Sequence, residues 1–112
     1  MNPLIEQLYA AFNARDLHAV LAHMHPNVHW PNGWEGGYVD GPEQVKAYWQ
    51  RQWQALNPQV TPVGTEDLPD GRVRVSVHQV IKDLDGKLVH DSMVAHVYTF
   101  SEGLITQMDI EG

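Results

Sequence analysis

The opening segment of the chain constrains the fold more than any other part of the sequence. Asn2 and Pro3 are typical of a helix start, because the Asn side chain can cap the first turn and Pro loses no hydrogen bond there. Apolar residues then recur at helical spacing at Leu4, Ile5, Leu8, Ala11 and Phe12. Asp16 can cap a second helix, whose inward stripe is Leu17, Val20, Leu21 and Met24. The sequence therefore predicts two short helices in close succession.

One further helix and a series of strands account for the rest of the chain. A short strand at 28–30 and a glycine-containing loop at 31–37 precede Asp40-Gly41-Pro42, which is typical of a helix start. The apolar stripe of this helix is Val45, Tyr48, Trp49, Trp53 and Leu56. Strands are predicted at 60–66, 72–82, 87–100 and 104–111, and Pro62 indicates that the first of them lies near a sheet edge.

This order of elements predicts an α+β fold. Two helices, a strand and a third helix come first, and antiparallel strands follow. We expect a cone-shaped, curved antiparallel sheet wrapped around the three helices of the N-terminal half and enclosing a pocket. At 112 residues, the chain is expected to form a single domain spanning 1–112.

Composition excludes several classes of function. The 14 acidic and 7 basic residues give a net charge of −7, and the basic residues are scattered, so we expect no nucleic-acid partner. No apolar run approaches the roughly 20 residues that a membrane span needs, and no signal-like segment opens the chain. We therefore expect no membrane association and a cytoplasmic location. The absence of Cys excludes disulfides, thiolate nucleophiles and Cys-based metal sites.

The register of the long hairpin decides which side chains face the pocket. If Asp85-Gly86 forms a two-residue turn, Val75 lies opposite His96, Val77 opposite Val94, and Gln79 opposite Ser92. The inner face is then an apolar wall with a few polar groups, and it also carries Tyr98. A three-residue turn would exchange the two faces.

His96 is the first candidate for chemistry, because no local catalytic motif is present in the sequence. Alternation places its imidazole in the core, where burial lowers the pKa of a histidine. It can act as a general acid or base, or it can be a core histidine with one hydrogen bond. Asn32 is the second catalytic candidate, because it can donate to a substrate oxygen or hold a water. Asn32 can equally be a turn residue before Gly33.

A second group of residues is predicted to bind the ligand. Aromatic rings and imidazoles suit an apolar wall that needs a few polar contacts. The candidate binding residues are Trp30, Trp49, Trp53, His78, Gln79 and Tyr98. Trp49 and Trp53 can also be plain core residues, and if they fill the cavity the enzyme hypothesis fails. We expect no metal and no cofactor, because His23 and His25 diverge on a helix and no other ligands are fixed nearby.

Three segments resemble the nuclear-transport-factor-2-like superfamily, and within it the SnoaL-like and ketosteroid-isomerase-like branch. They are Leu8-Tyr9-Ala10-Ala11-Phe12-Asn13-Ala14-Arg15-Asp16-Leu17, Asp40-Gly41-Pro42-Glu43-Gln44-Val45 and Tyr98-Thr99-Phe100-Ser101-Glu102-Gly103-Leu104-Ile105. The resemblance spans nearly the whole chain and implies the cone fold. It does not fix an activity, because this fold hosts isomerases, cyclases, dehydratases, epoxide hydrolases and binding proteins.

The resemblance carries over to the candidate site only in part. Asn32 stands where steroid isomerases have their proton-shuttling Asp, and Leu8 where they have a first-helix Tyr, so steroid isomerisation of that type is not expected. Their protonated Asp corresponds to His96, as does the acid–base Asp of SnoaL-like cyclases. The His and Gln of those cyclases on the preceding strand correspond to His78 and Gln79.

These observations lead to one main hypothesis and one alternative. The protein is expected to bind a small apolar or aromatic carbonyl compound, with cofactor-free acid–base chemistry of the isomerase, cyclase or lyase type at His96. The alternative is a non-catalytic ligand-binding or accessory protein. A homodimer through the sheet is also expected, because the outward face of the long strand carries Val89, Met93, Ala95 and Val97.

Overall fold

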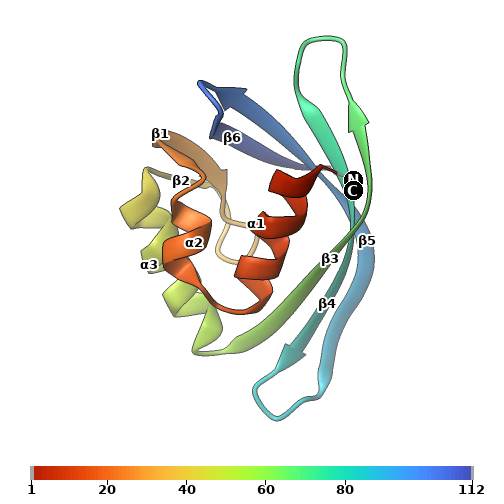
Figure 1. Cartoon of the computed structure of the whole chain (residues 1–112). Helices are drawn as coiled ribbons and strands as arrows, with labels where there is room; N and C mark the ends of the chain where they lie inside the picture. Colours follow the sequence, from red (N-terminus) through yellow and green to blue (C-terminus); the bar gives the residue numbers. More distant parts are fainter. Residues whose placement is uncertain (1, 112) are drawn as a thin grey trace.

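The three helices lie on the concave side of a curved six-stranded sheet (Figure 1). The structure, a computed structural model, describes residues 2–111, so both end residues of the predicted domain lie outside it. The helices are α1 (Pro3–Asn13), α2 (Leu17–Leu21) and α3 (Pro42–Trp53). The strands are β1 (Met24–Pro31), β2 (Tyr38–Asp40), β3 (Leu56–Asp67), β4 (Val73–Asp83), β5 (Leu88–Ser101) and β6 (Leu104–Glu111). The predicted α+β fold, with a curved sheet and helices in the N-terminal half, is confirmed.

The three helix starts follow the predicted capping chemistry. The Asn2 side chain accepts a hydrogen bond from the Leu4 N–H at 2.9 Å, and the Asp16 side chain accepts one from the Ala19 N–H at 3.2 Å. Helix α3 has no side-chain cap and begins after Gly41, whose φ of +81° is readily adopted only by glycine. Capping residues and prolines therefore locate all three starts.

Two helix ends were predicted wrongly. Helix α2 ends at Leu21, and Met24 is buried as the first residue of β1 rather than on a helix. Pro26 explains this end, because a proline pushes the preceding residue into an extended conformation. In the same way α3 ends at Trp53, and Leu56 begins β3 ahead of Pro58. The short strand β2 was not predicted at all.

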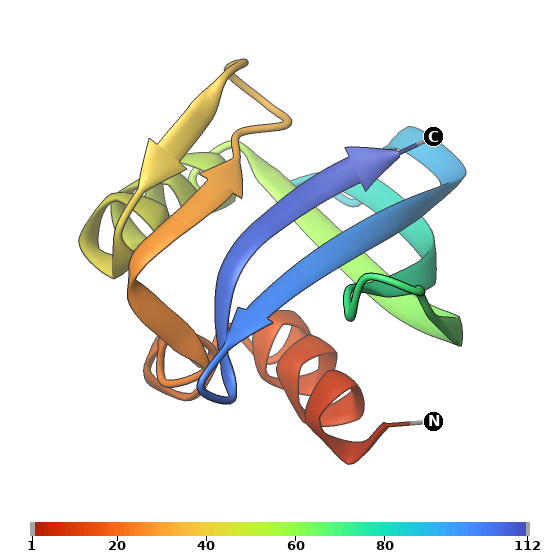
Figure 2. The ribbon, with the colours of Figure 1, turned by 90° about the horizontal axis from the view of Figure 1, so that it is seen from above.

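The sheet is not antiparallel throughout. Its order is β2-β1-β6-β5-β4-β3, and β1 pairs with β6 in parallel while every other pair is antiparallel. Figure 2 shows β1 and β6 side by side above α1, which is how the first and last strands of the chain meet. Strand β3 with Pro62 lies at the edge, as predicted.

The predicted register of the β4–β5 hairpin is confirmed, although the turn differs. Val75 pairs with His96, Val77 with Val94, and Gln79 with Ser92. The loop contains three residues, Leu84 to Gly86, because the Asp83 N–H donates to the Lys87 carbonyl. The pairing then shifts between Ile81 and Lys82, leaving Val89 without a partner. This bulge offsets the extra loop residue, so the inner face keeps its predicted composition.

The junction after α1 is tied to the edge strand. The Asn13 side chain donates to the Val60 carbonyl at 2.7 Å and accepts from the Val60 N–H at 2.9 Å. The Arg15 side chain donates to the Pro58 carbonyl at 2.6 Å. These bonds fix α1 across the concave face, where Ile5 is fully buried together with Val75 of the sheet.

The outward face of the sheet is less apolar than predicted. Val89 and Met93 on β5 are each more than half exposed, whereas Val97 is only 1% exposed. Arg74 on β4 donates to Glu111 on β6 at 3.1 Å, and β5 lies between these two strands. Arg74 pairs with Val97 in the register, so its side chain starts beside Val97 on the outward face and crosses β5 to reach Glu111. None of the described helices is long and apolar enough to cross a membrane.

Candidate functional site

A cavity of about 650 Å³ lies between α1, α3 and the concave face of the sheet. Six of the predicted site residues line it: Trp30, Asn32, Trp49, Gln79, His96 and Tyr98. No Asp, Glu, Lys or Arg within residues 2–111 is among its lining residues. The cavity therefore offers aromatic walls with a small number of polar groups, among them the amides of Gln52 and Gln79 and the imidazoles of His90 and His96.

His96 lies at one end of a buried hydrogen-bonded chain whose central member is Tyr9. The Tyr9 hydroxyl lies 2.7 Å from His96 Nδ1 and 2.8 Å from the Tyr98 hydroxyl. Helix α1 supplies Tyr9, and β5 supplies the other two, which alternate onto the inner face. The Tyr9 ring also stacks on the imidazole at 5.9 Å. The imidazole is thus held in one orientation by groups from two elements.

The protons of this chain favour one histidine tautomer. If Tyr98 donates to Tyr9 and Tyr9 donates to Nδ1, both hydroxyl protons are used, and the ring proton sits on Nε2. If the two hydrogen bonds run in the opposite direction, from His96 Nδ1–H to Tyr9 and from Tyr9 to Tyr98, the Tyr98 proton has no acceptor among the described residues. His96 Nε2 has no hydrogen-bond partner within residues 2–111. The atom keeps some accessible surface, and His96 lines the cavity, so Nε2 opens onto it. The arrangement presents an N–H donor to a bound molecule.

Burial keeps this donor neutral. His96 is 8% exposed, and burial lowers its pKa from the ordinary value to about 4, in the direction the sequence predicts. Burial also raises the pKa of Tyr9 and of Tyr98. At neutral pH, all three groups are therefore uncharged, and His96 can donate a hydrogen bond without bringing a charge into the cavity.

We predict that His96 makes the protein less stable in mild acid. An unfolded histidine binds a proton below about pH 6.5, whereas folded His96 stays neutral until about pH 4. Because the folded-state pKa is the lower one, stability is full above pH 6.5 and falls as the pH drops toward 4. Between pH 6.5 and pH 4, the free energy of unfolding falls by on the order of 3 kcal/mol through this one group.

Urea denaturation of the protein and of His96→Gln at several pH values measures this loss. The variant lacks the titrating group but keeps every carboxylate, so the difference in unfolding free energy between the two isolates His96. A difference that stays constant from pH 7 to pH 4.5 would contradict a buried, neutral His96.

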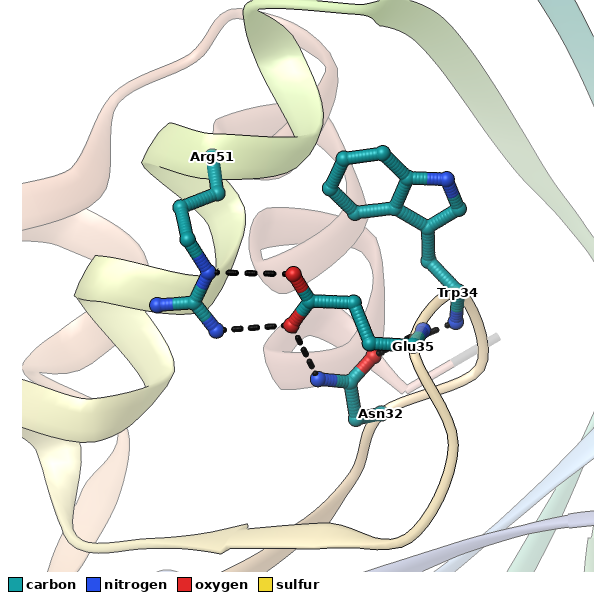
Figure 3. A network of polar contacts seen from close by, with 4 residues as sticks. All are labelled: Asn32, Trp34, Glu35 and Arg51. Atoms are coloured by element: carbon teal, nitrogen blue, oxygen red, sulfur yellow. Dashed lines mark hydrogen bonds and ion pairs between the residues drawn. The ribbon is translucent and has the colours of Figure 1, made fainter.

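Asn32 lines the cavity, but its amide is used by the loop that follows β1 (Figure 3). Its Oδ1 accepts from the backbone N–H groups of Trp34 and Glu35, at 3.2 and 2.7 Å. Its Nδ2 donates to the Glu35 carboxylate, which also binds Arg51 of α3 at 2.8 Å. These contacts match the turn alternative for Asn32 and tie the loop to α3.

Two predicted ligand-binding residues do not line the cavity. His78 lies on the outward face of β4, where its Nε2 is 2.7 Å from Asp91. Alternation explains this position, because its neighbour Gln79 takes the inward side. Trp53 packs against Phe12, with a ring separation of 5.6 Å, and against Trp49 at 6.0 Å. It belongs to the packing behind the cavity wall and leaves the cavity open.

Several lining residues, among them the polar Tyr9, Gln52 and His90, were missed from the sequence. Tyr9 stands next to Leu8, which the resemblance aligned with a first-helix Tyr, and the structure brings Tyr9 instead to His96. The sequence did contain a signal for the inward position of Tyr9, because Tyr9 lies four residues after Ile5 and both fall on the buried face of α1. Gln52 is buried on α3 and also lines the cavity. A polar residue on a helix gives no comparable sequence signal.

The family comparison agrees with the fold and with the resemblance. The SnoaL-like domain family matches residues 5–108. No curated protein matches the sequence significantly. Similar solved structures are numerous, and among them are an NTF2-like protein and a protein with a ketosteroid isomerase-like fold.

Three solved structures illustrate the likeness. An NTF2-like protein of unknown function from Burkholderia pseudomallei is 22% identical, with a TM-score of 0.83 over 96% of this chain and 86% of that chain. TerC, co-crystallised with polyporic acid, is 27% identical, with a TM-score of 0.82 over 96% and 86%. A Mycobacterium tuberculosis protein in complex with estradiol-17beta-hemisuccinate is 20% identical, with a TM-score of 0.79 over 94% and 87%.

Proposed function

Because this chain belongs to the SnoaL-like domain family, we propose that its cavity binds a small, flat, mostly apolar carbonyl compound. We propose further that His96 supports cofactor-free acid–base chemistry of the isomerase, cyclase or lyase type on that compound. The observation that carries the proposal is the neutral His96 imidazole, which faces an aromatic cavity and is fixed from behind by Tyr9.

The geometry suits a carbonyl oxygen as the acceptor. His96 Nε2–H donates to the oxygen and stabilises the negative charge that develops on it when a neighbouring C–H bond breaks, and the proton released from carbon passes to His90, the second histidine of the cavity lining. A neutral imidazole does this without an ion pair, and Tyr98 and Tyr9 can shift their protons along the chain as charge builds up. A phosphorylated or carboxylated ligand would meet no cationic side chain of the cavity lining within residues 2–111.

The ligands of two structural neighbours support small-molecule binding. TerC was crystallised with polyporic acid, and the Mycobacterium tuberculosis protein with estradiol-17beta-hemisuccinate. A cavity of about 650 Å³ lies within the range of small-molecule sites, which span roughly 300–1,000 Å³. We therefore take fluorenone, a planar and uncharged aromatic ketone, as the first probe.

A non-catalytic ligand-binding protein is the second candidate function. The favouring observation is that no carboxylate lines the cavity within the described residues, while Asn32 is occupied by its own loop. Proton abstraction from carbon then depends on His90, the second histidine of the cavity lining, because the lowered pKa of His96 makes that residue a weak base. In the non-catalytic case, His96 holds the ligand oxygen and no reaction follows.

Tryptophan fluorescence tests binding, since Trp30 and Trp49 line the cavity. We expect fluorenone to quench the emission in a saturable manner, and His96→Gln to bind it more strongly than His96→Ala because glutamine keeps an N–H donor. Quenching that never saturates would overturn the proposed function.

We also propose that the protein forms a homodimer through the outward face of the sheet. Met93 is 55% exposed at the middle of this face, with Val89 beside it on β5. A two-fold contact would cover the same patch on both copies. Sedimentation at micromolar concentration is expected to give a dimer that Met93→Asp dissociates, whereas Val63→Asp, at an equally exposed valine of β3, leaves it intact. A monomeric parent protein would rule this assembly out.

A further inference from the structure

Gln52 is a buried amide without a protein partner. It is 9% exposed, lies on α3 and lines the cavity. Its side-chain amide makes no hydrogen bond within residues 2–111. The amide nitrogen and oxygen are not completely enclosed by protein atoms. Both atoms therefore retain accessible surface, and because Gln52 lines the cavity, a molecule bound there can reach them. Leaving a buried amide unpaired costs free energy, so such a group calls for an explanation.

Of the other amides near the cavity, Asn13 and Asn32 have structural tasks, whereas Gln79 of β4 lines the cavity without a hydrogen bond within residues 2–111 but is only partly buried. Asn13 donates to and accepts from Val60, and Asn32 holds the loop after β1. Gln52 does neither. Its neighbour Arg51 points the other way, to the Glu35 carboxylate, and fixes the C-terminal part of α3 against the loop. The helix thus holds the Gln52 amide toward the cavity with no bond that satisfies it.

Gln52 and His96 reach the cavity from different walls. Helix α3 carries Gln52, whereas β5 of the sheet carries His96, and the helices and the sheet face each other (Figure 1). A molecule between them meets the imidazole N–H on one side and the carboxamide on the other. The carboxamide has two N–H donors and one carbonyl acceptor, so it can bind a hydroxyl group in either direction.

We propose that Gln52 is a specificity-determining residue that binds a second oxygen function of the ligand, a hydroxyl group or a second carbonyl. This inference rests on the proposed function, because His96 must hold the first oxygen. The ligand class is therefore a flat, uncharged aromatic or alicyclic ketone that carries a further hydroxyl or carbonyl group at a distance from the first. An otherwise similar ketone with a single oxygen leaves the Gln52 amide unpaired and binds more weakly.

The experiment compares fluorenone with its ring-hydroxylated isomers by tryptophan quenching. We expect at least one hydroxyfluorenone to bind the parent protein about tenfold more tightly than fluorenone, the scale of one neutral hydrogen bond. Gln52→Met, which keeps the length of the side chain without its amide, is expected to abolish this preference and leave the affinity for fluorenone itself unchanged. Retained fluorenone binding shows that the variant is folded.

Gln50→Met is the matched control, because Gln50 lies on the same helix and is exposed. It should retain the full hydroxyl preference. If Gln52→Met loses fluorenone binding altogether, Gln52→Leu provides the same comparison. A hydroxyl preference that is absent in the parent protein, or that persists in the Gln52 variant, overturns the role of Gln52. Failure of the parent protein to bind fluorenone and its isomers overturns the proposed function and this inference together.

Discussion

His96→Ala is expected to abolish catalysed proton exchange on a bound ketone while lowering its affinity by no more than about tenfold. One neutral hydrogen bond accounts for the loss in binding, whereas acid–base chemistry has no other titratable group at the end of the Tyr9–His96 chain. β-Tetralone in deuterated water is a suitable probe, because exchange of the protons beside its carbonyl is read directly by NMR.

The His96→Gln variant separates donation from proton transfer. Glutamine can donate a hydrogen bond but cannot titrate, so this variant should bind β-tetralone and not exchange its protons. Exchange that continues at the parent rate in His96→Ala would contradict the catalytic assignment. If the parent protein binds β-tetralone without accelerating exchange, the non-catalytic binding function holds instead.

Trp49→Ala is expected to lower the free energy of unfolding by about 3–5 kcal/mol. Trp49 is buried, and its ring packs at 5.5 Å from Trp30 and at 5.1 Å from Phe12. Removing the indole leaves a void that α3 and the sheet can close only in part. Urea denaturation measures the effect. Trp34→Ala is the control, because Trp34 is 40% exposed and its removal should lower the free energy of unfolding by well under half as much.

Ligand binding gives the second readout for Trp49. The ring forms part of the cavity wall, so its removal should weaken fluorenone binding through lost contact area. A stability loss of less than about 1 kcal/mol would contradict the packing of the aromatic wall. If Trp49→Ala and His96→Ala both leave fluorenone binding untouched, the ligand binds elsewhere and the site is wrongly assigned.

The local parts of this fold were predictable because local chemistry determines them. Asn2, Asp16 and Pro42 mark the helix starts, and strict alternation puts His96 and Tyr98 on the inner face. The hairpin register was predicted correctly although its turn was not, since the bulge at Val89 offsets a longer loop. The apolar inner face constrains the register more strongly than the turn does.

The long-range parts were not predictable from these patterns. The parallel pairing of β1 with β6 joins segments from opposite ends of the chain, which no local period reports. Tyr9 reaches His96 across 87 positions, and Gln52 faces the cavity only because α3 packs with that side inward. The site therefore depends on contacts between elements, whereas sequence reasoning identified residues one strand or helix at a time.

The most direct test of the central claim is the protonation state and ligand response of His96 by nitrogen NMR. With uniformly ¹⁵N-labelled protein, the His96 ring signals are assigned by their loss in His96→Gln. The expected result is a neutral imidazole at pH 6 with its proton on Nε2, and an Nε2 signal that shifts on addition of fluorenone while Nδ1 keeps its bond to Tyr9. A ring that titrates near pH 6.5, or an Nε2 signal indifferent to a saturating ketone, would contradict the account.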